Sequence, residues 1–325
     1  MGAAHSSAGL TCLENPPKKP RREAPPEGVA CRRAPAGPEI EERVNHFASG
    51  LEQEGLTPPN PDGMKLLAIY SKNRPEWIIA EQACAAFTHS AITVPLYETL
   101  GPETVEFVVN QTTLTTVVCG GLAELQKLGV IAREGRCPSL QTAVVMDGIS
   151  ERDRDEAVRA GLRVYAFAEV EAIGASHPHP HRPPAATDIA TFCYTSGTTG
   201  NPKGALISHR NLIADAAAGD LMKAFTPEAS DVYLSYLPLP HIFERMVQAR
   251  RVTILSVGAS MGFFRGDPTL LVEDMQALRP TTMPVVPRVM NRFHDKIVQG
   301  MLAAGGLKTK LFVKACEAKV HARGR

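Results

Sequence analysis

The sequence lacks long apolar runs and an excess of charge of either sign. No segment reaches the roughly 18–20 consecutive apolar residues that a membrane-spanning helix needs, and the N-terminus has no apolar signal-peptide core. Lys and Arg number 35 against 34 Asp and Glu, a net charge of +1, which argues against a dedicated nucleic-acid binder. Because 44% of the 325 residues are hydrophobic, we expect a folded core, no transmembrane segment and no nucleic-acid partner.

Cysteine pairs with metal-binding or redox spacing are also missing. The seven cysteines are odd in number and scattered, with no C-x-x-C pair and no Cys/His grouping of zinc spacing. Histidines alternate with prolines between His177 and His181, but without a nearby carboxylate or cysteine this pattern favours a solvated linker over a metal site. We therefore expect reduced, mostly buried thiols and no metal-ligating side chains.

Residues 1–38 differ in composition from the rest of the chain. They contain seven prolines and few large apolar residues, so they bury too little surface to offset their chain entropy, and we predict a disordered Pro/Arg-rich tail. Two interpretations of this tail stay open. Its composition and the basic run Lys18–Arg22 favour a solvated segment. The start Met1–Ser6 also matches the pattern for N-myristoylation of Gly2, and an acyl chain with a basic run would allow peripheral membrane association.

From residue 39 onward, helical patterns alternate with short apolar runs. Glu39–Gly55 has helical periodicity, and Pro75 opens a second helix, because proline is tolerated in a first helical turn. Apolar runs typical of buried strands lie at Leu66–Tyr70, Ala91–Leu96, Leu114–Cys119, Thr142–Met146, Arg163–Phe167 and Ile189–Tyr194. This alternation predicts an α/β fold, with a mostly parallel sheet and helices on both of its faces.

The strand at Ile189–Tyr194 runs directly into a loop that is dense in phosphate-binding groups. Four hydroxyls, three glycines and one lysine fall within ten residues, at Thr195, Ser196, Gly197, Thr198, Thr199, Gly200, Lys203 and Gly204. Glycines let a phosphate approach the main chain closely, and successive backbone N–H groups form an anion-binding concavity. Hydroxyls donate further hydrogen bonds, and the lysine adds a compact positive charge. The loop therefore predicts a binding site for the phosphates of a nucleotide.

Other interpretations of this loop fit the residues less well. A Ser/Gly-rich surface turn rarely follows a buried strand with so many donors. The loop of P-loop NTPases ends in Gly-Lys-Ser/Thr, whereas here Pro202 precedes Lys203 and Gly204 follows it. Dinucleotide binding is weaker still, because the chain has no G-x-G-x-x-G.

The segment Tyr194–Gly204, Y-T-S-G-T-T-G-N-P-K-G, resembles the phosphate-loop signature of the adenylate-forming superfamily. Further blocks resemble the long-chain fatty acyl-CoA ligases of that superfamily, and they lie at Ser71–Trp77, Val94–Gly101, Ser235–Arg245, Gly262–Asp267 and Pro284–Arg292. The likeness covers about residues 39–325. It implies that these residues form the large N-terminal domain of the adenylate-forming fold.

The resemblance implies a ligase reaction in two steps. A long-chain fatty acid attacks the α-phosphate of ATP, giving acyl-AMP and pyrophosphate, and the thiol of coenzyme A then displaces AMP to give acyl-CoA. Charge builds on the phosphates in the first step, so fixed donors and a cation lower its barrier. The implied small molecules are ATP, Mg²⁺, coenzyme A and the fatty acid. The implied location is the cytoplasm, or the cytosolic face of the endoplasmic reticulum or mitochondrial outer membrane.

The resemblance also assigns roles to individual residues. It implies that the β- and γ-phosphates are held by Thr195, Ser196, Thr198, Thr199 and Lys203, in a loop shaped by Gly197, Gly200 and Gly204. Lys203 and His241 are the implied catalytic residues, although a lone histidine after Pro240 also fits a helix-start or packing role. We expect Phe243 either to line an acyl channel or to pack in the core. Glu244 and Arg245 are expected to form a local charged pair or a solvated face.

Several features of the ligase family are missing from the sequence. They are the Tyr-Gly-x-Thr-Glu block, the Thr-Gly-Asp block, the small C-terminal domain and the N-terminal membrane anchor. We therefore expect residues 39–325 to be a truncated AMP-binding domain, an incomplete large domain with impaired ligase activity. The alternative from another class is a non-catalytic fragment that binds nucleotide or a partner ligase. The sequence indicates no oligomeric state.

Overall fold

The computed structural model describes residues 32–33, 37–86, 91–195, 201–221, 228–245 and 258–323. The chain divides into two compact units, one that ends at Thr282 and one that starts at Met283. This division falls inside the stretch 39–325 that we predict to be a single domain, and that prediction stays open. Within the described ranges, none of the helices combines the length and apolar character needed to cross a bilayer.

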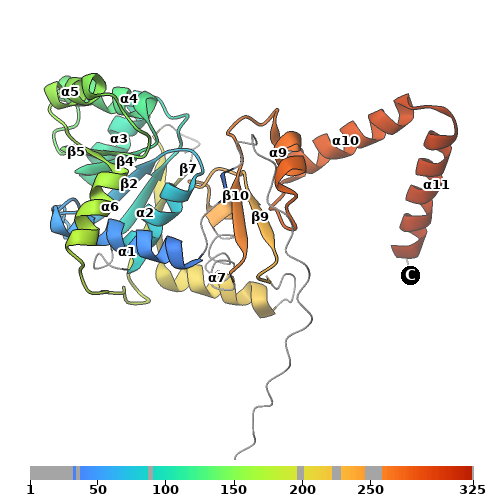
Figure 1. The fold of residues 1–325 in the computed structure, drawn as a ribbon, viewed down its shortest axis with the longest axis horizontal. Helices are drawn as coiled ribbons and strands as arrows, with labels where there is room; N and C mark the ends of the chain where they lie inside the picture. Colours follow the sequence, from blue (N-terminus) through green and yellow to red (C-terminus); the bar gives the residue numbers. More distant parts are fainter. Residues whose placement is uncertain are drawn as a thin grey trace, which may run out of the picture. The chain divides into compact units, whose positions relative to one another are not determined.

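A seven-stranded sheet forms the centre of the first unit, in the order β6-β5-β4-β2-β3-β7-β8 (Figure 1). Its strands are β2 (Leu66–Tyr70), β3 (Ile92–Leu96), β4 (Thr116–Cys119), β5 (Thr142–Val145), β6 (Arg163–Ala166), β7 (Ile189–Thr195) and β8 (Lys203–Ser208). Neighbouring strands run parallel, except that β8 is antiparallel to β7. The mostly parallel sheet predicted from the apolar runs is thus confirmed.

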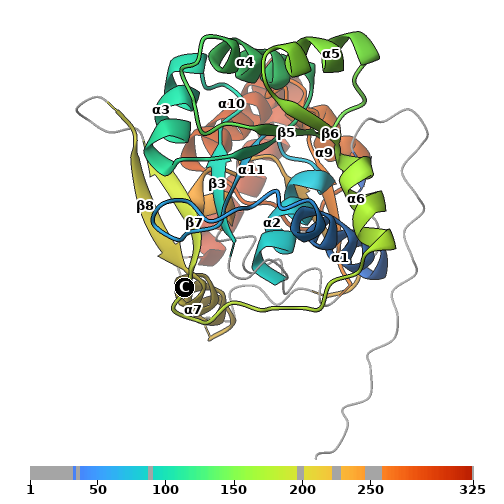
Figure 2. The same cartoon turned by 90° about the vertical axis from the view of Figure 1, so that its left-hand side faces the viewer.

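Helices cover both faces of this sheet (Figure 2). One face carries α1 (Gly37–Gln53), α2 (Pro75–Ala86) and α6 (Phe167–Ser176), and the other carries α3 (Pro102–Thr112), α4 (Leu122–Arg133) and α5 (Glu151–Arg159). Side chains of β2 alternate between the two cores, because successive residues of a strand point to opposite faces. Leu67 and Ile69 join the first cluster, whereas Leu66, Ala68 and Tyr70 join the second. The predicted two-sided cover by helices is therefore confirmed.

A smaller sheet, in the order β1-β10-β9, lies in the same unit. It consists of β1 (Arg32–Arg33), β9 (Val232–Ser235) and β10 (Ser260–Phe263), near helices α7 (His209–Leu221) and α9 (Leu271–Leu278) (Figure 1). Strand β1 pairs antiparallel with β10, and α1 begins at Gly37. The tail predicted to be disordered through residue 38 is therefore corrected at Arg32–Arg33 and Gly37. Residues 1–31 and 34–36, including Gly2, lie outside the described residues.

The second unit consists of α10 (Pro287–Ala303) and α11 (Gly306–Arg323). The Thr309 hydroxyl donates to the Met301 carbonyl at 2.7 Å and links the two helices. The sequence from Leu307 onward is rich in lysine and predicts a basic helix, and α11 confirms that helix.

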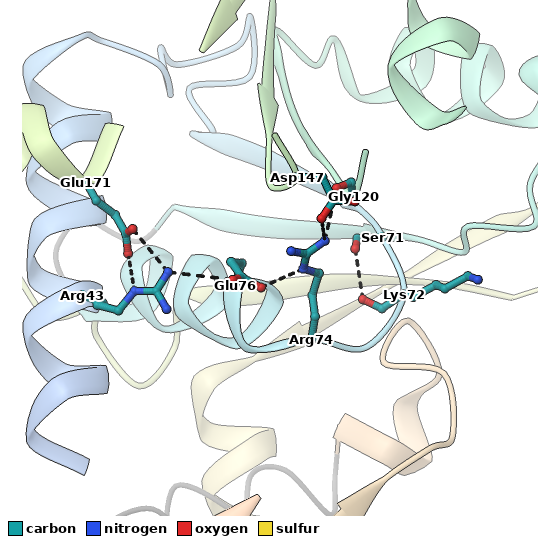
Figure 3. Close-up of polar contacts among 8 residues, drawn as sticks. All are labelled: Arg43, Ser71, Lys72, Arg74, Glu76, Gly120, Asp147 and Glu171. Carbon is teal, nitrogen blue, oxygen red and sulfur yellow. Dashed lines mark hydrogen bonds and ion pairs between the residues drawn. The ribbon is translucent and has the colours of Figure 1, made fainter. Parts of the chain in front are cut away.

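Arg74 connects the loops that follow three strands of the large sheet (Figure 3). Its guanidinium donates to Glu76 at 2.7 Å, to Asp147 after β5 at 2.8 Å, and to the Gly120 carbonyl after β4 at 3.2 Å. Arg43 of α1 lies 4.0 Å from Glu76 and extends the row of charges. Ion pairs to Glu76 and Asp147 raise the pKa of Arg74, although desolvation by burial opposes them. This row fixes the carboxyl ends of β2, β4 and β5 relative to one another.

Candidate functional site

The two ends of the predicted phosphate loop lie side by side on one hairpin. Thr195 ends β7 and Lys203 begins β8, and the two residues are partners in the antiparallel register. The Thr195 hydroxyl donates to the Lys203 carbonyl at 3.4 Å. Between them, Ser196, Gly197, Thr198, Thr199 and Gly200 lie outside the described residues, so their predicted roles stay predictions. The hairpin confines the start and end of the loop to one spot, with the Lys203 side chain exposed.

Gly204 lies directly against the ring of Tyr194. A Cβ at Gly204 would stand 3.2 Å from the Tyr194 Cζ atom, closer than a normal contact. The Tyr194 hydroxyl donates to Gln111 of α3 at 2.7 Å, and burial raises the pKa of Tyr194 to about 12, so the phenol remains a donor at neutral pH. The hydrogen bond holds the ring in place, so a side chain at position 204 would have to displace it by a few tenths of an ångström. No role for Tyr194 could be predicted from the sequence, because its partner Gln111 is 83 residues away in the chain.

His241 begins a short helical turn at residues 242–245. Its backbone N–H donates to the Pro238 carbonyl at 3.0 Å, and the Phe243 N–H donates to its Nδ1 atom at 3.1 Å. Because Nδ1 accepts, the proton of the neutral ring sits on Nε2. The helix-start role of His241 is therefore confirmed, and its exposed ring leaves Nε2–H available as a donor. Its predicted catalytic role stays a prediction.

The turn that carries His241 is attached to the strand that leads into the phosphate loop. The Cys193 thiol of β7 contacts the Pro240 carbonyl at 3.8 Å, within the range of a weak sulfur hydrogen bond. Cys193 is two residues before Thr195, and Pro240 is directly before His241. The structure thus brings the described ends of the loop and the His241 turn into one neighbourhood at the end of β7.

Glu244 and Arg245 correct a sequence expectation. We predict a local charged pair or a solvated face from the sequence, yet their exposed fractions are 0% and 3%. Glu244 accepts hydrogen bonds from Tyr233 at 3.2 Å and Ser235 at 3.0 Å. Arg245 reaches partners 54 to 164 residues away in the sequence. Partners so distant in the sequence leave no local pattern. Two adjacent charged residues are therefore predicted to lie on the surface, although here they are buried.

Phe243 is 37% exposed. This exposure contradicts the core-packing alternative that the sequence left open for Phe243. Its other expected role, in an acyl channel, stays a prediction.

The described thiols fit the expectation of a reduced, mostly buried set. Cys84, Cys119, Cys137 and Cys193 are buried thiols that form no disulfide with another described residue, whereas Cys316 is exposed. Burial raises the pKa of Cys137 to about 11 and also raises that of Cys193. A thiol that stays protonated is a poor nucleophile, so the chemistry of this site is not assigned to cysteine.

The chain belongs to the AMP-binding enzyme family, whose model matches residues 37–320. It is 39% identical over 276 residues to the peroxisomal long chain acyl-CoA synthetase 6 of Arabidopsis thaliana, covering 85% of this chain and 37% of that protein. It is 38% identical over 263 residues to the human long-chain-fatty-acid–CoA ligase 1, covering 80% of this chain and 36% of that protein. The chain thus spans somewhat more than a third of the length of these relatives.

Solved structures with the same fold include adenylation domains. The A domain of a carboxylic acid reductase from Segniliparus rugosus, solved with AMP and a carboxylic acid, matches with a TM-score of 0.68 at 22% identity. That match covers 85% of this chain and 45% of the other. ATP-bound MatB from Rhodopseudomonas palustris matches with a TM-score of 0.55 at 22% identity, over 78% of this chain and 44% of the other. These likenesses confirm the predicted adenylate-forming α/β fold.

Proposed function

We propose that this chain carries the ATP-phosphate loop and the adjoining histidine turn of a long-chain fatty acid–CoA ligase. The family and the names of the relatives support the reaction class. The observation that carries the proposal is the β7–β8 hairpin, in which Thr195 is paired with Lys203. That pairing holds the two described ends of the loop side by side at the carboxyl end of β7.

The proposed reaction has two displacements. A carboxylate oxygen of the fatty acid bonds to the α-phosphorus of ATP as the bond to pyrophosphate breaks. The coenzyme A thiol then loses its proton, its sulfur bonds to the carbonyl carbon, and AMP leaves. In this proposal Lys203 and the loop hydroxyls hold the β- and γ-phosphates, where fixed donors lower the barrier as charge develops.

His241 has a distinct proposed part. Its Nδ1 is used by the Phe243 N–H, so the remaining Nε2–H is the group it offers to an oxygen of the reacting carboxylate or phosphate. A neutral donor stabilises developing negative charge without a proton transfer of its own.

Mg²⁺ enters the proposal as the counter-ion of the ATP phosphates, which it would neutralise when bound. In the part of the chain that the structure describes, no group of three or more His, Cys, Asp or Glu side chains could hold a metal. No described side chain is proposed as a ligand of the ion. Coenzyme A, the fatty acid, peripheral membrane association and a location in the cytoplasm, or on the cytosolic face of the endoplasmic reticulum or mitochondrial outer membrane, belong to the same proposal.

Isothermal titration of the purified chain with Mg-ATP tests this function. Lys203→Ala should weaken ATP binding by about tenfold or more, because a charge-assisted phosphate contact is lost. Lys65→Ala is the matched control. Lys65 pairs with Glu52 at 3.5 Å and directly precedes β2, so it lies at the amino end of the parallel strands, away from the carboxyl end of β7. If wild type takes up no ATP, or if both variants bind alike, the proposed loop function is wrong.

Pyrophosphate release separates the two function classes. Release that requires ATP and a long-chain fatty acid together supports the ligase. ATP binding without any release supports a nucleotide-binding fragment instead.

A further inference from the structure

We propose that Arg245 is a positioning residue that braces β7, and with it the phosphate loop, against the turn that carries His241. The proposal rests on the proposed function, because it concerns how that site is held in shape. Its role is positioning and not catalysis, because the side chains that it contacts belong to β7, β3 and α2.

The guanidinium of Arg245 reaches three other elements. It donates to Thr191 of β7 at 2.5 Å, to Thr93 of β3 at 3.2 Å and to Glu81 of α2 at 3.0 Å. Its Cζ atom lies 5.8 Å from the ring centre of Trp77, also in α2, which is within the range of a cation–π contact. One side chain thus ties the His241 turn to a helix and two strands.

The contact falls where β7 joins the rest of the sheet. Among the described residues, Thr93 and Thr191 are the one registered pair between β3 and β7. Both hydroxyls that accept from Arg245 also donate across this junction, Thr191 to the Thr93 carbonyl at 2.9 Å and Thr93 to the Ala190 carbonyl at 3.4 Å. The guanidinium therefore adds side-chain hydrogen bonds at a junction where the backbone pairing between β3 and β7 is short.

The two residues that this contact joins each lie four residues from a part of the site. Thr191 is four residues before Thr195, where the phosphate loop begins, and Arg245 is four residues after His241. A shift of β7 relative to the turn would separate the loop from the histidine. Small misplacements of this kind weaken reactions strongly, because reacting groups must be held in one geometry.

An arginine can contact both threonine hydroxyls and Glu81 at once, whereas a lysine cannot. The planar guanidinium offers several donors in a fixed fork, whereas an ammonium is a compact point charge on a flexible stem. Glu81 compensates the charge of the buried arginine, which would otherwise be strongly unfavourable. In Arg245→Lys the charge pair survives, but the simultaneous contact with both hydroxyls is lost.

The first measurement compares ATP with AMP, which lacks the phosphates that the loop is proposed to hold. Arg245→Lys and Thr191→Val should each weaken ATP binding about tenfold, the effect of losing roughly one hydrogen bond, and should leave the AMP affinity within about twofold. The double variant should lose less than the product of the two, because both changes break the same contact. Titrations are run well below the thermal midpoint of each variant.

A matched control is Arg43→Lys. Arg43 makes a two-pronged contact with Glu171 of α6, at 2.8 and 3.3 Å, in an arrangement similar to that of Arg245 and Glu81 (Figure 3). This control should lower thermal stability without changing the ratio of ATP to AMP affinity. If Arg245 served only the stability of the fold, every variant would bind both ATP and AMP more weakly, in proportion to its loss of stability. That result would overturn the proposal.

A second measurement needs no nucleotide. Hydrogen exchange of the free chain should become about tenfold faster in both β7 and residues 237–245 of Arg245→Lys, with peptides of α1 and α6 unchanged. Unchanged protection of β7 would refute the brace. A wild type that binds no ATP but shows the predicted exchange would instead remove the proposed function and keep the brace.

Discussion

The side chain of Asn73 holds the backbone of Leu239 through a hydrogen bond of 3.0 Å from the Leu239 N–H to the Asn73 Oδ1 atom. Its Nδ2 atom donates to the Leu237 carbonyl at 2.7 Å and to the Ser235 hydroxyl at 2.9 Å. Asn73 follows β2 of the large sheet, and Ser235 ends β9 of the small one. A single buried amide therefore joins the two sheets directly before the His241 turn.

Replacing this amide should be costly. Asn73→Ala removes the partner of the buried Leu239 N–H and a partner of the partly buried Leu237 carbonyl, and an unsatisfied buried group costs about 1–3 kcal/mol. We expect a loss of at least that size in urea unfolding monitored by the fluorescence of Trp77. Asn110→Ala is the control, because Asn110 makes one exposed hydrogen bond to the Arg136 carbonyl; its effect should stay within about 0.5 kcal/mol. Equal effects of the two variants would contradict the role of the Asn73 amide in joining the two sheets.

Helices α1 and α6 approach each other so closely that one glycine is required. A Cβ at Gly174 would lie 1.8 Å from the His46 carbonyl oxygen, which no side-chain movement can relieve. Gly174→Ala should therefore destabilise the fold by about 1–3 kcal/mol or more. Gly129→Ala in α4 is the control, since its Cβ would meet only Ala160 at 3.9 Å, and alanine is favoured over glycine in helices by about 1 kcal/mol. In thermal unfolding, the midpoint temperature should fall for Gly174→Ala and rise for Gly129→Ala.

Part of this architecture could be predicted from the sequence. Apolar runs predict strands well where both faces are covered, and the run Leu66–Tyr70 matches β2 residue for residue. Helices α4 and α6 were missed. Helix α6 contains Gly174, which α1 requires for close packing, and a glycine weakens a helical pattern. The close approach depends on both helices together, so it cannot be predicted from the segment of α1 or of α6 alone.

The site was predictable only where its residues are contiguous. Thr195 and Lys203 are predicted phosphate ligands because the donors of a phosphate loop are neighbours in the chain, and the two residues pair across the hairpin. Their phosphate-binding role stays a prediction. The buried roles of Arg245 and Asn73 depend on partners more than 50 residues away, and such contacts arise only when the sheet is assembled. The roles of these two residues therefore required the fold.

Gly204 allows a direct test of the packing beside the loop. Gly204→Ala should lower stability by on the order of 1 kcal/mol and weaken ATP binding, because the new methyl group presses on Tyr194. Tyr194→Phe releases the ring from Gln111, so the double variant should lose less than the sum of the two single changes. Gly101→Ala serves as the control, since a Cβ there meets open space. Strict additivity of the two changes in urea unfolding would argue against contact between residues 194 and 204.

His209 should make stability depend on pH below neutrality. Its Nε2 atom is buried and finds no hydrogen-bond partner within the described residues. Desolvation lowers the pKa of His209 below 6.5, and the nearby carboxylates of Asp188 and Glu81 oppose this only in part. The folded state therefore favours the neutral ring, while the unfolded chain takes up a proton as the pH falls through 6.5. Stability should be highest above that value and should decline as the pH falls toward the folded pKa.

The comparison with His209→Gln isolates this effect. The chain has ten histidines, and the other nine are present in both proteins, so their contributions largely cancel in the difference between them. The free energy of unfolding in urea, measured at pH 8, 7, 6 and 5, should fall more steeply toward acid for wild type than for the variant. The gap between the two should begin to change near pH 6.5, where the unfolded histidine starts to bind its proton. Parallel curves over this range would mean that the buried ring is protonated as readily in the folded chain as in the unfolded one.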